Sequence, residues 1–123
     1  MIPIVTPQGQ PLNWGINANS FEGNLVINQI DANDSSLQGV IFGDAIRGFW
    51  DEAAQKITFI REPNNNNPEQ SQIYTGYLFQ NQNGPLDTIF TLTGYFEAFK
   101  AAGGTAQRNL FGWFAQATIH IDV

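Results

Sequence analysis

A glycine with a large apolar residue two positions before it and another two positions after it occurs six times in this chain of 123 residues. These glycines are Gly23, Gly39, Gly48, Gly76, Gly94 and Gly112. In a β-strand, residues i and i+2 point to the same face, so each copy puts a glycine between two apolar side chains. Glycine inside a strand costs about 0.5–1 kcal/mol relative to alanine, and it marks bends or close approach of a neighbouring backbone. The pattern therefore predicts strands that curve into a closed sheet.

Eight stretches rich in β-branched and aromatic residues are separated by clusters of turn residues, and no segment longer than ten residues has helical spacing. The expected strands are 12–17, 21–30, 37–42, 45–51, 56–62, 72–80, 88–99 and 109–121. Gly43 and Asp44 are expected to form a two-residue type II′ turn, which has glycine at its first position. We predict an all-β fold: an eight-stranded antiparallel up-and-down β-barrel in a single domain of residues 12–123, preceded by an extended N-terminal arm of residues 1–11.

The face that carries the glycines is expected to line the barrel. Burying one large side chain contributes roughly 1.5–3 kcal/mol, so the apolar residues of this face outweigh the cost of the glycines. They are Leu37, Ile41, Ile46, Trp50, Tyr74, Leu78, Phe90, Leu92, Phe96, Leu110 and Phe114. Gly76, Gly94 and Gly112 follow one another at intervals of 18 residues, which predicts that they lie side by side along the inner wall.

The opposite face becomes strongly apolar in the last three expected strands. Beside and beyond the glycines it carries Tyr77, Phe79, Tyr95, Phe99, Phe111, Trp113, Ala115, Ala117 and Ile119. A surface this apolar is seldom left bare in a monomer. We therefore predict a homo-oligomer, a dimer or a tetramer, with Tyr77, Tyr95, Phe111 and Trp113 in its interface. The alternative is that the chain ends or the Asn-rich loop of residues 63–68 cover this face.

Charge and cysteine content exclude several classes of partner and chemistry. The formal net charge is −6 and the five basic residues are scattered, so neither nucleic acid nor a membrane surface is an expected partner. The chain has no cysteine, which rules out disulfides, thiol catalysis and zinc–thiolate sites. Its first residues lack the pattern of a signal peptide, and no apolar run approaches the roughly 18 residues of a membrane helix. We expect a soluble, cytoplasmic protein.

Residues suited to catalysis or metal binding are few. His120 is the only histidine, and no Ser-His-Asp set, phosphate loop or calcium loop is present. Glu97 lies in an apolar strand, but the alternation directs it outward, beside Tyr95. We therefore expect no metal, no cofactor and no catalytic residue.

Eight consecutive strands, a tryptophan in the first and repeated Thr-Gly-aromatic segments resemble the avidin/streptavidin-like barrels over most of residues 12–121. Leu92-Thr93-Gly94-Tyr95 is similar to the Leu-Thr-Gly-x-Tyr segments of that family. Trp14 and Ser20 keep the spacing of its first-strand motif, and Asn17 is displaced by one position. The resemblance implies a calycin-type barrel with a small-molecule site at its open end.

The biotin-binding residues implied by the resemblance are mostly not matched. Ile41, Tyr74 and Phe114 stand where the family has a ring-lining tyrosine, a wall tryptophan and a ureido-binding aspartate. A ureido group requires converging hydrogen-bond donors and acceptors, of which only Ser20 and Asn17 remain. The resemblance therefore implies the fold more than the ligand.

Three functions stay open from the sequence. The first is a non-enzymatic barrel that binds a small apolar or aromatic ligand at its mouth. Its candidate ligand-binding residues are Trp14, Asn17, Ser20, Trp50, Tyr74, Phe90, Phe96 and Phe114. The second is a barrel isomerase or cyclase acting on an apolar substrate, with Gln116 and His120 as the inward polar groups. The third is a structural protein-interaction module with a lumen filled by its own side chains.

Overall fold

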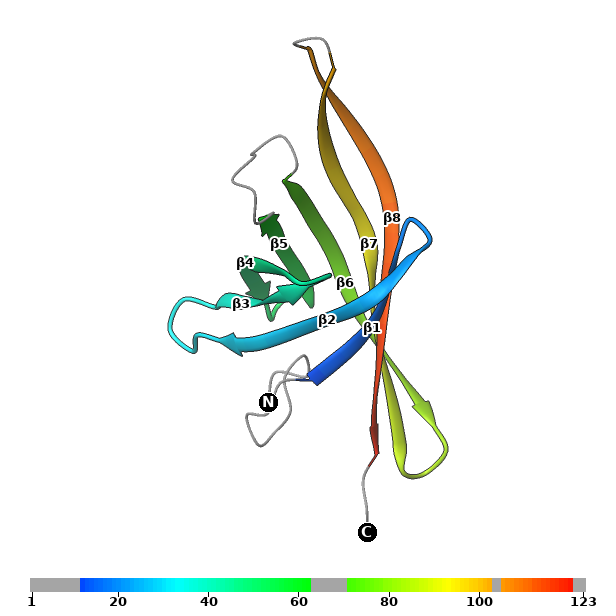
Figure 1. Cartoon of the computed structure of the whole chain (residues 1–123). Helices are drawn as coiled ribbons and strands as arrows, with labels where there is room; N and C mark the ends of the chain where they lie inside the picture. Colours follow the sequence, from blue (N-terminus) through cyan, green and yellow to red (C-terminus); the bar gives the residue numbers. More distant parts are fainter. Residues whose placement is uncertain (1–11, 63–70, 103–104, 121–123) are drawn as a thin grey trace.

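The computed structural model describes residues 12–62, 71–102 and 105–120, with the backbone alone for residues 99–102, 105–108 and 120. This part of the chain consists of eight β-strands (Figure 1). They are β1 (Leu12–Ala18), β2 (Phe21–Ile30), β3 (Ser36–Ile41), β4 (Asp44–Asp51), β5 (Lys56–Glu62), β6 (Gln72–Asn83), β7 (Asp87–Ala102) and β8 (Thr105–His120). Each expected strand is present, and β7 and β8 form a longer hairpin than expected, with 16 residues in each strand.

The strands form one closed barrel in which each pairs antiparallel with its neighbours in sequence and β8 pairs with β1. The predicted eight-stranded up-and-down barrel is thereby confirmed. Its closing seam is short: β1 and β8 share four residue pairs, from Gly15 opposite Gln116 to Ala18 opposite Trp113. Within the described residues, no helix is long and apolar enough to cross a membrane. The predicted arm of residues 1–11 and the Asn-rich loop of residues 63–68 lie outside this part of the chain.

The interior of the barrel is lined as expected in β3, β4, β6 and β7. Nine of the predicted inner residues are buried: Leu37, Ile41, Ile46, Trp50, Tyr74, Leu78, Phe90, Leu92 and Phe96. Strands β1, β2 and β5 add Trp14, Ile16, Ala18, Leu25, Ile27, Ile57 and Phe59. The apolar area that these side chains withdraw from water is the main stabilising contribution to the fold.

The last strand has the opposite orientation to the one expected. Leu110 and Phe114 are 63% and 47% exposed, whereas Trp113, Ala115 and Ala117 are buried. The predicted inward orientation of Leu110 and Phe114 is therefore wrong. The predicted outward orientation of Trp113, Ala115 and Ala117 is also wrong.

The pairing register explains this reversal. Gly76 pairs with Gly94, as expected, but Gly94 pairs with Trp113, and Gly112 lies opposite Tyr95 on the outer face. A shift of one residue in register turns every side chain of a strand to the other face. The predicted row of three glycines on the inner wall is therefore wrong for Gly112.

Trp113 occupies the space that Gly76 leaves free. A Cβ atom at Gly76 would lie 2.5 Å from Cζ2 of the indole. The indole Nε1 donates hydrogen bonds to the backbone oxygens of Thr75 and Tyr95, at 3.1 and 3.0 Å. The Thr93 hydroxyl donates to the backbone oxygen of Trp113 at 3.0 Å. One side chain thus connects β6, β7 and β8 from inside the barrel.

The turn between β3 and β4 holds a phenylalanine in a left-handed backbone conformation. Ile41 pairs with Asp44, so the turn residues are Phe42 and Gly43, with φ angles of 49° and 81°. Positive φ at both central residues is the type I′ pattern, which favours Asn-Gly. The predicted type II′ turn over Gly43 and Asp44 is therefore wrong by one residue. The Phe42 ring lies over Gly23, where an added Cβ atom would come within 2.5 Å of ring carbon Cδ1.

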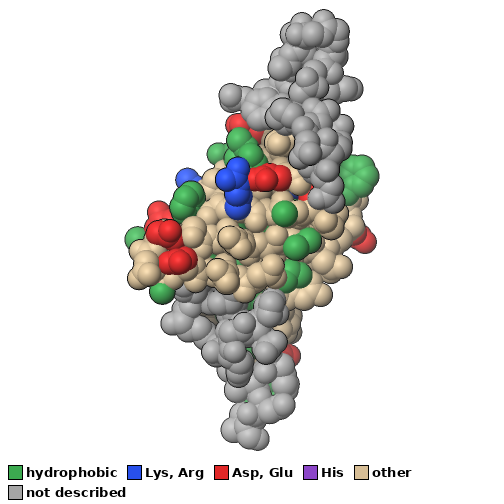
Figure 2. All heavy atoms as spheres, turned by 60° about the vertical axis from the view of Figure 1, so that its left-hand side comes forward, with side chains coloured by type: hydrophobic (Ala, Val, Ile, Leu, Met, Phe, Trp, Pro, Cys, Tyr) green, Lys and Arg blue, Asp and Glu red, His purple; other side chains and the backbone are tan. Residues whose placement is uncertain are grey.

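Exposed aromatic side chains gather on the outer face of β6, β7 and β8. Tyr77, Phe79, Tyr95 and Phe114 are each between 43% and 57% exposed, and together they are named the outer aromatic patch. Pairing brings them together, because Thr93 lies opposite Tyr77 on one side and opposite Phe114 on the other. On the side of the barrel that carries β3 to β5, hydrophobic side chains form small separate groups among polar atoms (Figure 2).

Gly94→Ala is expected to destabilise the barrel by about 1–3 kcal/mol, because the new Cβ atom would overlap the backbone oxygen of Thr75. Gly112→Ala is the matched control, since the nearest atom to its Cβ would be the backbone oxygen of Gly94 at 3.9 Å. We expect that control to leave stability unchanged or to raise it by about 0.5–1 kcal/mol. Urea unfolding followed by tryptophan fluorescence measures both, and an equal loss in the two variants would contradict the observed register.

Candidate functional site

A row of four aromatic rings crosses the inner wall at one level. Phe59 pairs with Tyr74, Tyr74 with Phe96, and Phe96 with Phe111, so the four residues come from β5, β6, β7 and β8. Neighbouring ring centroids are 4.8, 4.7 and 5.3 Å apart along the row. Such cross-strand aromatic contacts stabilise a sheet beyond the area that they bury. Phe111, predicted to lie in an outer interface, is therefore an inner residue.

Three tryptophans fill much of the remaining interior. The Trp113 ring packs edge-on against Tyr74, with centroids 5.7 Å apart. Trp14 and Trp50 are buried, and Nε1 of Trp50 donates a hydrogen bond to the carboxylate of Glu52. In the described part of the chain, Nε1 of Trp14 is the one buried side-chain nitrogen or oxygen without a hydrogen-bond partner. The lumen is therefore largely occupied by the protein's own side chains.

One end of the barrel retains a hollow of about 340 Å³, named the mouth pocket. It is lined by Ala18, Phe21, Phe42, Arg61, Gln72, Tyr74 and Phe96. Ala18 and Phe21 flank the β1–β2 turn, Phe42 lies in the β3–β4 turn, and Gln72 begins β6, so the lining comes from one end of the barrel. Hollows of this size and apolar character accommodate small organic molecules.

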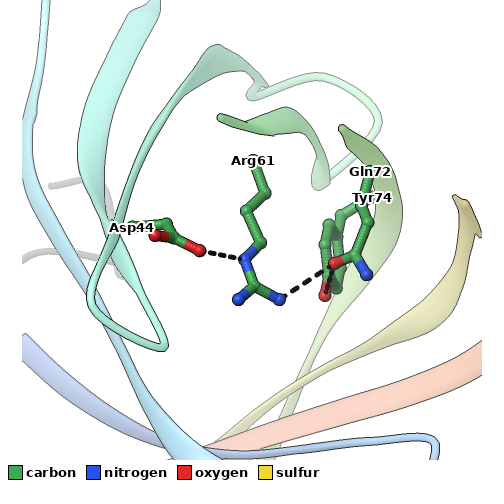
Figure 3. Close-up of polar contacts among 4 residues, drawn as sticks. All are labelled: Asp44, Arg61, Gln72 and Tyr74. Atoms are coloured by element: carbon green, nitrogen blue, oxygen red, sulfur yellow. Dashed lines mark hydrogen bonds and ion pairs between the residues drawn. The ribbon is translucent and has the colours of Figure 1, made fainter. Parts of the chain in front are cut away.

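Four polar side chains form a chain of hydrogen bonds across the mouth pocket (Figure 3). Nε of Arg61 donates to Oδ2 of Asp44 at 2.7 Å, and Nη1 donates to Oε1 of Gln72 at 3.2 Å. The Tyr74 hydroxyl donates to the same Gln72 oxygen at 2.8 Å. The guanidinium carbon also lies 5.2 Å from the centroid of the Phe42 ring, at which distance cation and ring attract each other.

The ion pair between Arg61 and Asp44 is largely withdrawn from water. Their side chains are 23% and 16% exposed. Removing two charges from water is costly, and apolar residues of similar volume often give a more stable protein than a buried pair. Local departures from what stability favours tend to occur at functional sites. A charged pair among phenylalanines therefore identifies the mouth pocket as the candidate site.

Burial raises the pKa of the Tyr74 hydroxyl above its ordinary value of 10.0, because the phenolate would lose its hydration. The positive charge of Arg61 acts in the opposite direction and limits the rise in this pKa. The Tyr74 hydroxyl therefore stays protonated at physiological pH. In that state it is available as the hydrogen-bond donor to Gln72.

The structure separates the residues that were predicted to bind a ligand. Tyr74 and Phe96 line the mouth pocket. Trp14, Trp50 and Phe90 are buried in the core and are not among the residues that line it. Trp50 and Phe90 therefore fill the barrel, which was the alternative to a ligand-lined lumen, and Trp14 is a core residue as well.

The remaining three predicted residues lie outside the pocket. Asn17 alternates outward between buried neighbours, and its side-chain oxygen accepts a hydrogen bond from the backbone N–H of Ser20 at 3.0 Å. Ser20 is an exposed residue of the β1–β2 turn. Phe114 lies opposite Asn17 on the outer face. The predicted placement of Phe114 in the lumen is therefore wrong.

Sequence reasoning missed the polar half of the pocket, although a signal for part of it was present. Ile57, Phe59 and Arg61 alternate along β5, so the arginine shares the inner face of two buried residues. Gln72 precedes Tyr74 on the inner face of β6 in the same way. A charged or amide residue in phase with core residues at the end of a strand could have identified the site.

Of the two polar groups predicted to point into the lumen, the prediction is wrong for Gln116. Gln116 is exposed on the outer face, where its Nε2 donates a hydrogen bond to the Thr91 hydroxyl at 3.3 Å. The side chain of His120 lies outside the described part of the structure. Among the described residues, no group of three His, Cys, Asp or Glu side chains is arranged to hold a metal ion.

Comparison with solved structures shows an avidin-like fold. The crystal structure of a rhizavidin–biotin complex matches with a TM-score of 0.59 and 14% sequence identity, over 85% of this chain and 98% of that chain. No family model and no curated protein sequence matches the chain. The predicted resemblance to avidin-like barrels is confirmed at the level of the fold.

Arg61→Gln is expected to raise the pKa of Tyr74 further, because the charge that favours the phenolate is lost while burial remains. Alkaline absorbance titration of each protein, minus that of its Tyr74→Phe counterpart, isolates the Tyr74 hydroxyl. Since the folded pKa lies above the unfolded value of 10.0, the stability contributed by this group is intact below that pH and is lost as the pH rises through the folded pKa. A lower pKa in Arg61→Gln would contradict the assigned cause.

Proposed function

We propose that this protein is a non-enzymatic barrel that binds one small apolar or aromatic molecule in the mouth pocket. The observation that carries the proposal is the pocket itself, about 340 Å³ walled by Phe21, Phe42, Tyr74 and Phe96. Binding sites for small molecules combine an apolar lining with a few convergent polar groups, and Arg61 and its hydrogen-bond partners supply these groups.

The β3–β4 turn supports a binding role for this end of the barrel. A type I′ turn favours asparagine where this chain has Phe42, and a bulky residue at a φ of 49° is strained. Strain of this kind costs of order 1–3 kcal/mol and concentrates at ligand clamps and active sites. The compensating feature is that the ring is held over the mouth pocket, against Gly23 and Arg61.

The proposed ligand is not biotin, although the rhizavidin structure contains it. Ile41 is buried where the family resemblance implies a ring-lining tyrosine. The described inward side chains of β8 are those of Phe111, Trp113, Ala115, Ala117 and Ile119, and none of them is a carboxylate. Trp113 also fills the inner wall at the level of Gly76. The polar groups that line the mouth pocket come instead from β5 and β6, and Asp44 of β4 accepts a hydrogen bond from one of them, Arg61.

A panel of small aromatic compounds with biotin included tests the proposal by thermal shift and isothermal titration. We expect binding by aromatic members of the panel and no response to biotin. Phe21→Ala should weaken binding by about fivefold to tenfold, and because Phe21 is 72% exposed its loss should change stability little. Phe49→Ala is the matched control, since Phe49 is 61% exposed on the outer face of β4 and does not line the mouth pocket.

Three results would count against this function. A response to biotin alone would reverse the interpretation of Ile41 and β8. An equal loss of binding in Phe21→Ala and Phe49→Ala would place the ligand outside the mouth pocket. If no compound shifts the melting temperature or gives a binding isotherm, the structural interaction module becomes the favoured function.

We also propose that the outer aromatic patch joins two copies of the chain, in a dimer or a tetramer. Tyr77, Phe79, Tyr95 and Phe114 form a contiguous apolar area on three adjacent strands. Contiguous apolar patches of this kind mark interfaces more often than bare surface. Phe111 and Trp113, predicted as interface residues, are inner residues and are not part of the proposed interface.

Light scattering at micromolar concentration is expected to give a mass of at least two chains. Tyr95→Lys places a charge on the middle strand of the patch and should give a monomer. Phe49→Lys adds the same charge at an exposed aromatic residue outside the patch and should keep the oligomeric mass. A monomeric wild-type protein would remove the proposed interface.

A further inference from the structure

We propose that the mouth pocket selects small aromatic carboxylates, with the carboxylate on the terminal nitrogens of Arg61 and the aromatic ring between the phenylalanine walls. The inference rests on the proposed function and narrows it to one chemical class of ligand. It follows from three properties of the pocket: the direction of its hydrogen bonds, the orientation of the guanidinium and the apolar lining.

The hydrogen bonds around the mouth pocket occupy the acceptor oxygens of Gln72 and Asp44. Oε1 of Gln72 accepts from both Arg61 and the Tyr74 hydroxyl, and Oδ2 of Asp44 accepts from Nε of Arg61. A guanidinium carries five N–H donors and no acceptor, and the amide nitrogen of a glutamine side chain is also a donor. The polar wall of the pocket is therefore dominated by donors, so a complementary ligand has to bring acceptor oxygens.

The guanidinium is oriented for a two-oxygen acceptor. Figure 3 shows the Arg61 guanidinium between Asp44 and Gln72, and Arg61 is one of the residues that line the mouth pocket. Nε donates a hydrogen bond to Asp44 and Nη1 donates one N–H to Gln72, so the guanidinium is held on two sides. Because Arg61 lines the mouth pocket, its Nη1–Nη2 edge is the part that a ligand there would meet. Arginine binds carboxylates bidentately through such an edge, with charge-assisted bonds about twice as strong as neutral ones.

The remaining lining fits the ring of the ligand. Phe21, Phe42 and Phe96 surround the hollow, and the Tyr74 ring is stacked on Phe96 with centroids 4.7 Å apart. Aromatic ligands gain from offset stacking and edge contacts on such walls. An apolar body next to one charged group is the shape of an aromatic acid, since an aliphatic diacid would leave an unpaired carboxylate against phenylalanine.

Removing the charge of Asp44 is expected to strengthen the binding of an aromatic acid, although Asp44 is hydrogen-bonded to the arginine of the pocket. Its carboxylate already neutralises Arg61, so it competes with a bound carboxylate and repels it. Removing the charge of Asp44 should therefore strengthen the binding of an aromatic acid. The same change should leave a neutral aromatic ligand nearly unaffected.

The test compares 2-naphthoate with 2-naphthamide, which share the ring system and differ in charge, by fluorescence titration of the full chain at low salt. We expect wild type to bind the acid about tenfold more tightly than the amide. Asp44→Asn should raise that preference and Arg61→Gln should abolish it, with Arg61→Lys intermediate because lysine keeps the charge without the fork. Arg47→Gln, which breaks the exposed Arg47–Glu62 pair, is the matched control and should keep the wild-type preference.

The outcomes separate the two proposals. Equal binding of acid and amide by wild type, or a preference that persists in Arg61→Gln, overturns the carboxylate inference while the binding function stands. Weaker binding of the acid by Asp44→Asn also overturns it. Failure of wild type to bind either compound overturns both proposals. Circular dichroism of each variant establishes that the barrel is folded, and if Arg61→Gln is not folded the comparison of Asp44→Asn with Arg47→Gln decides the question.

Discussion

The contact between the Trp113 indole and Gly76 determines what the interior of this barrel can be. Because Gly76 has no side chain, the sheet leaves a shallow space that the indole fills. The indole N–H donates hydrogen bonds to backbone oxygens of β6 and β7, which fix the ring there. The interior of an eight-stranded barrel is just wide enough either to be filled by side chains or to hold one small ligand. Because Trp113 and the aromatic row beside it take up that width, open space remains at the mouth.

The mouth is assembled from residues that stability alone would not select. Phe42 is held in a backbone conformation that suits asparagine or glycine, and Arg61 and Asp44 form an ion pair among aromatic rings. Sequence patterns predict what is locally consistent, so they missed this cluster. Asp44, Arg61 and Gln72 also come from three different strands, and only the pairing of β4 with β5 and of β5 with β6 brings them together. That proximity depends on register, which is a property of the folded sheet.

The strands, the closure of the barrel and the inner face of β3, β4, β6 and β7 could be predicted because each of these four strands carries a glycine with a large apolar residue two positions to either side, which marks one face. In β8 both faces are apolar, with Trp113 on one and Phe114 on the other, so alternation contains no information about direction. The equal spacing of Gly76, Gly94 and Gly112 did not predict which residues pair, because the register of a hairpin is set by the length of its loop. Three residues separate Asn83 from its partner Asp87, whereas two follow Ala102 before its partner Thr105, and this difference moves Gly112 out of the glycine row.

The short closing seam described above has a dynamic consequence. Four residue pairs hold β1 to β8, whereas 16 pairs hold β7 to β8. Separating β1 from β8 therefore breaks far fewer backbone contacts than separating β7 from β8. Regions with few contacts open locally at a fraction of the free energy of global unfolding. At one end of the seam Ala18, which lines the pocket, is paired with Trp113, which plugs the lumen. Local opening between β1 and β8 therefore displaces Ala18 and Trp113 together. A ligand bound in the mouth pocket would oppose this opening and so stabilise the pairing of the two strands.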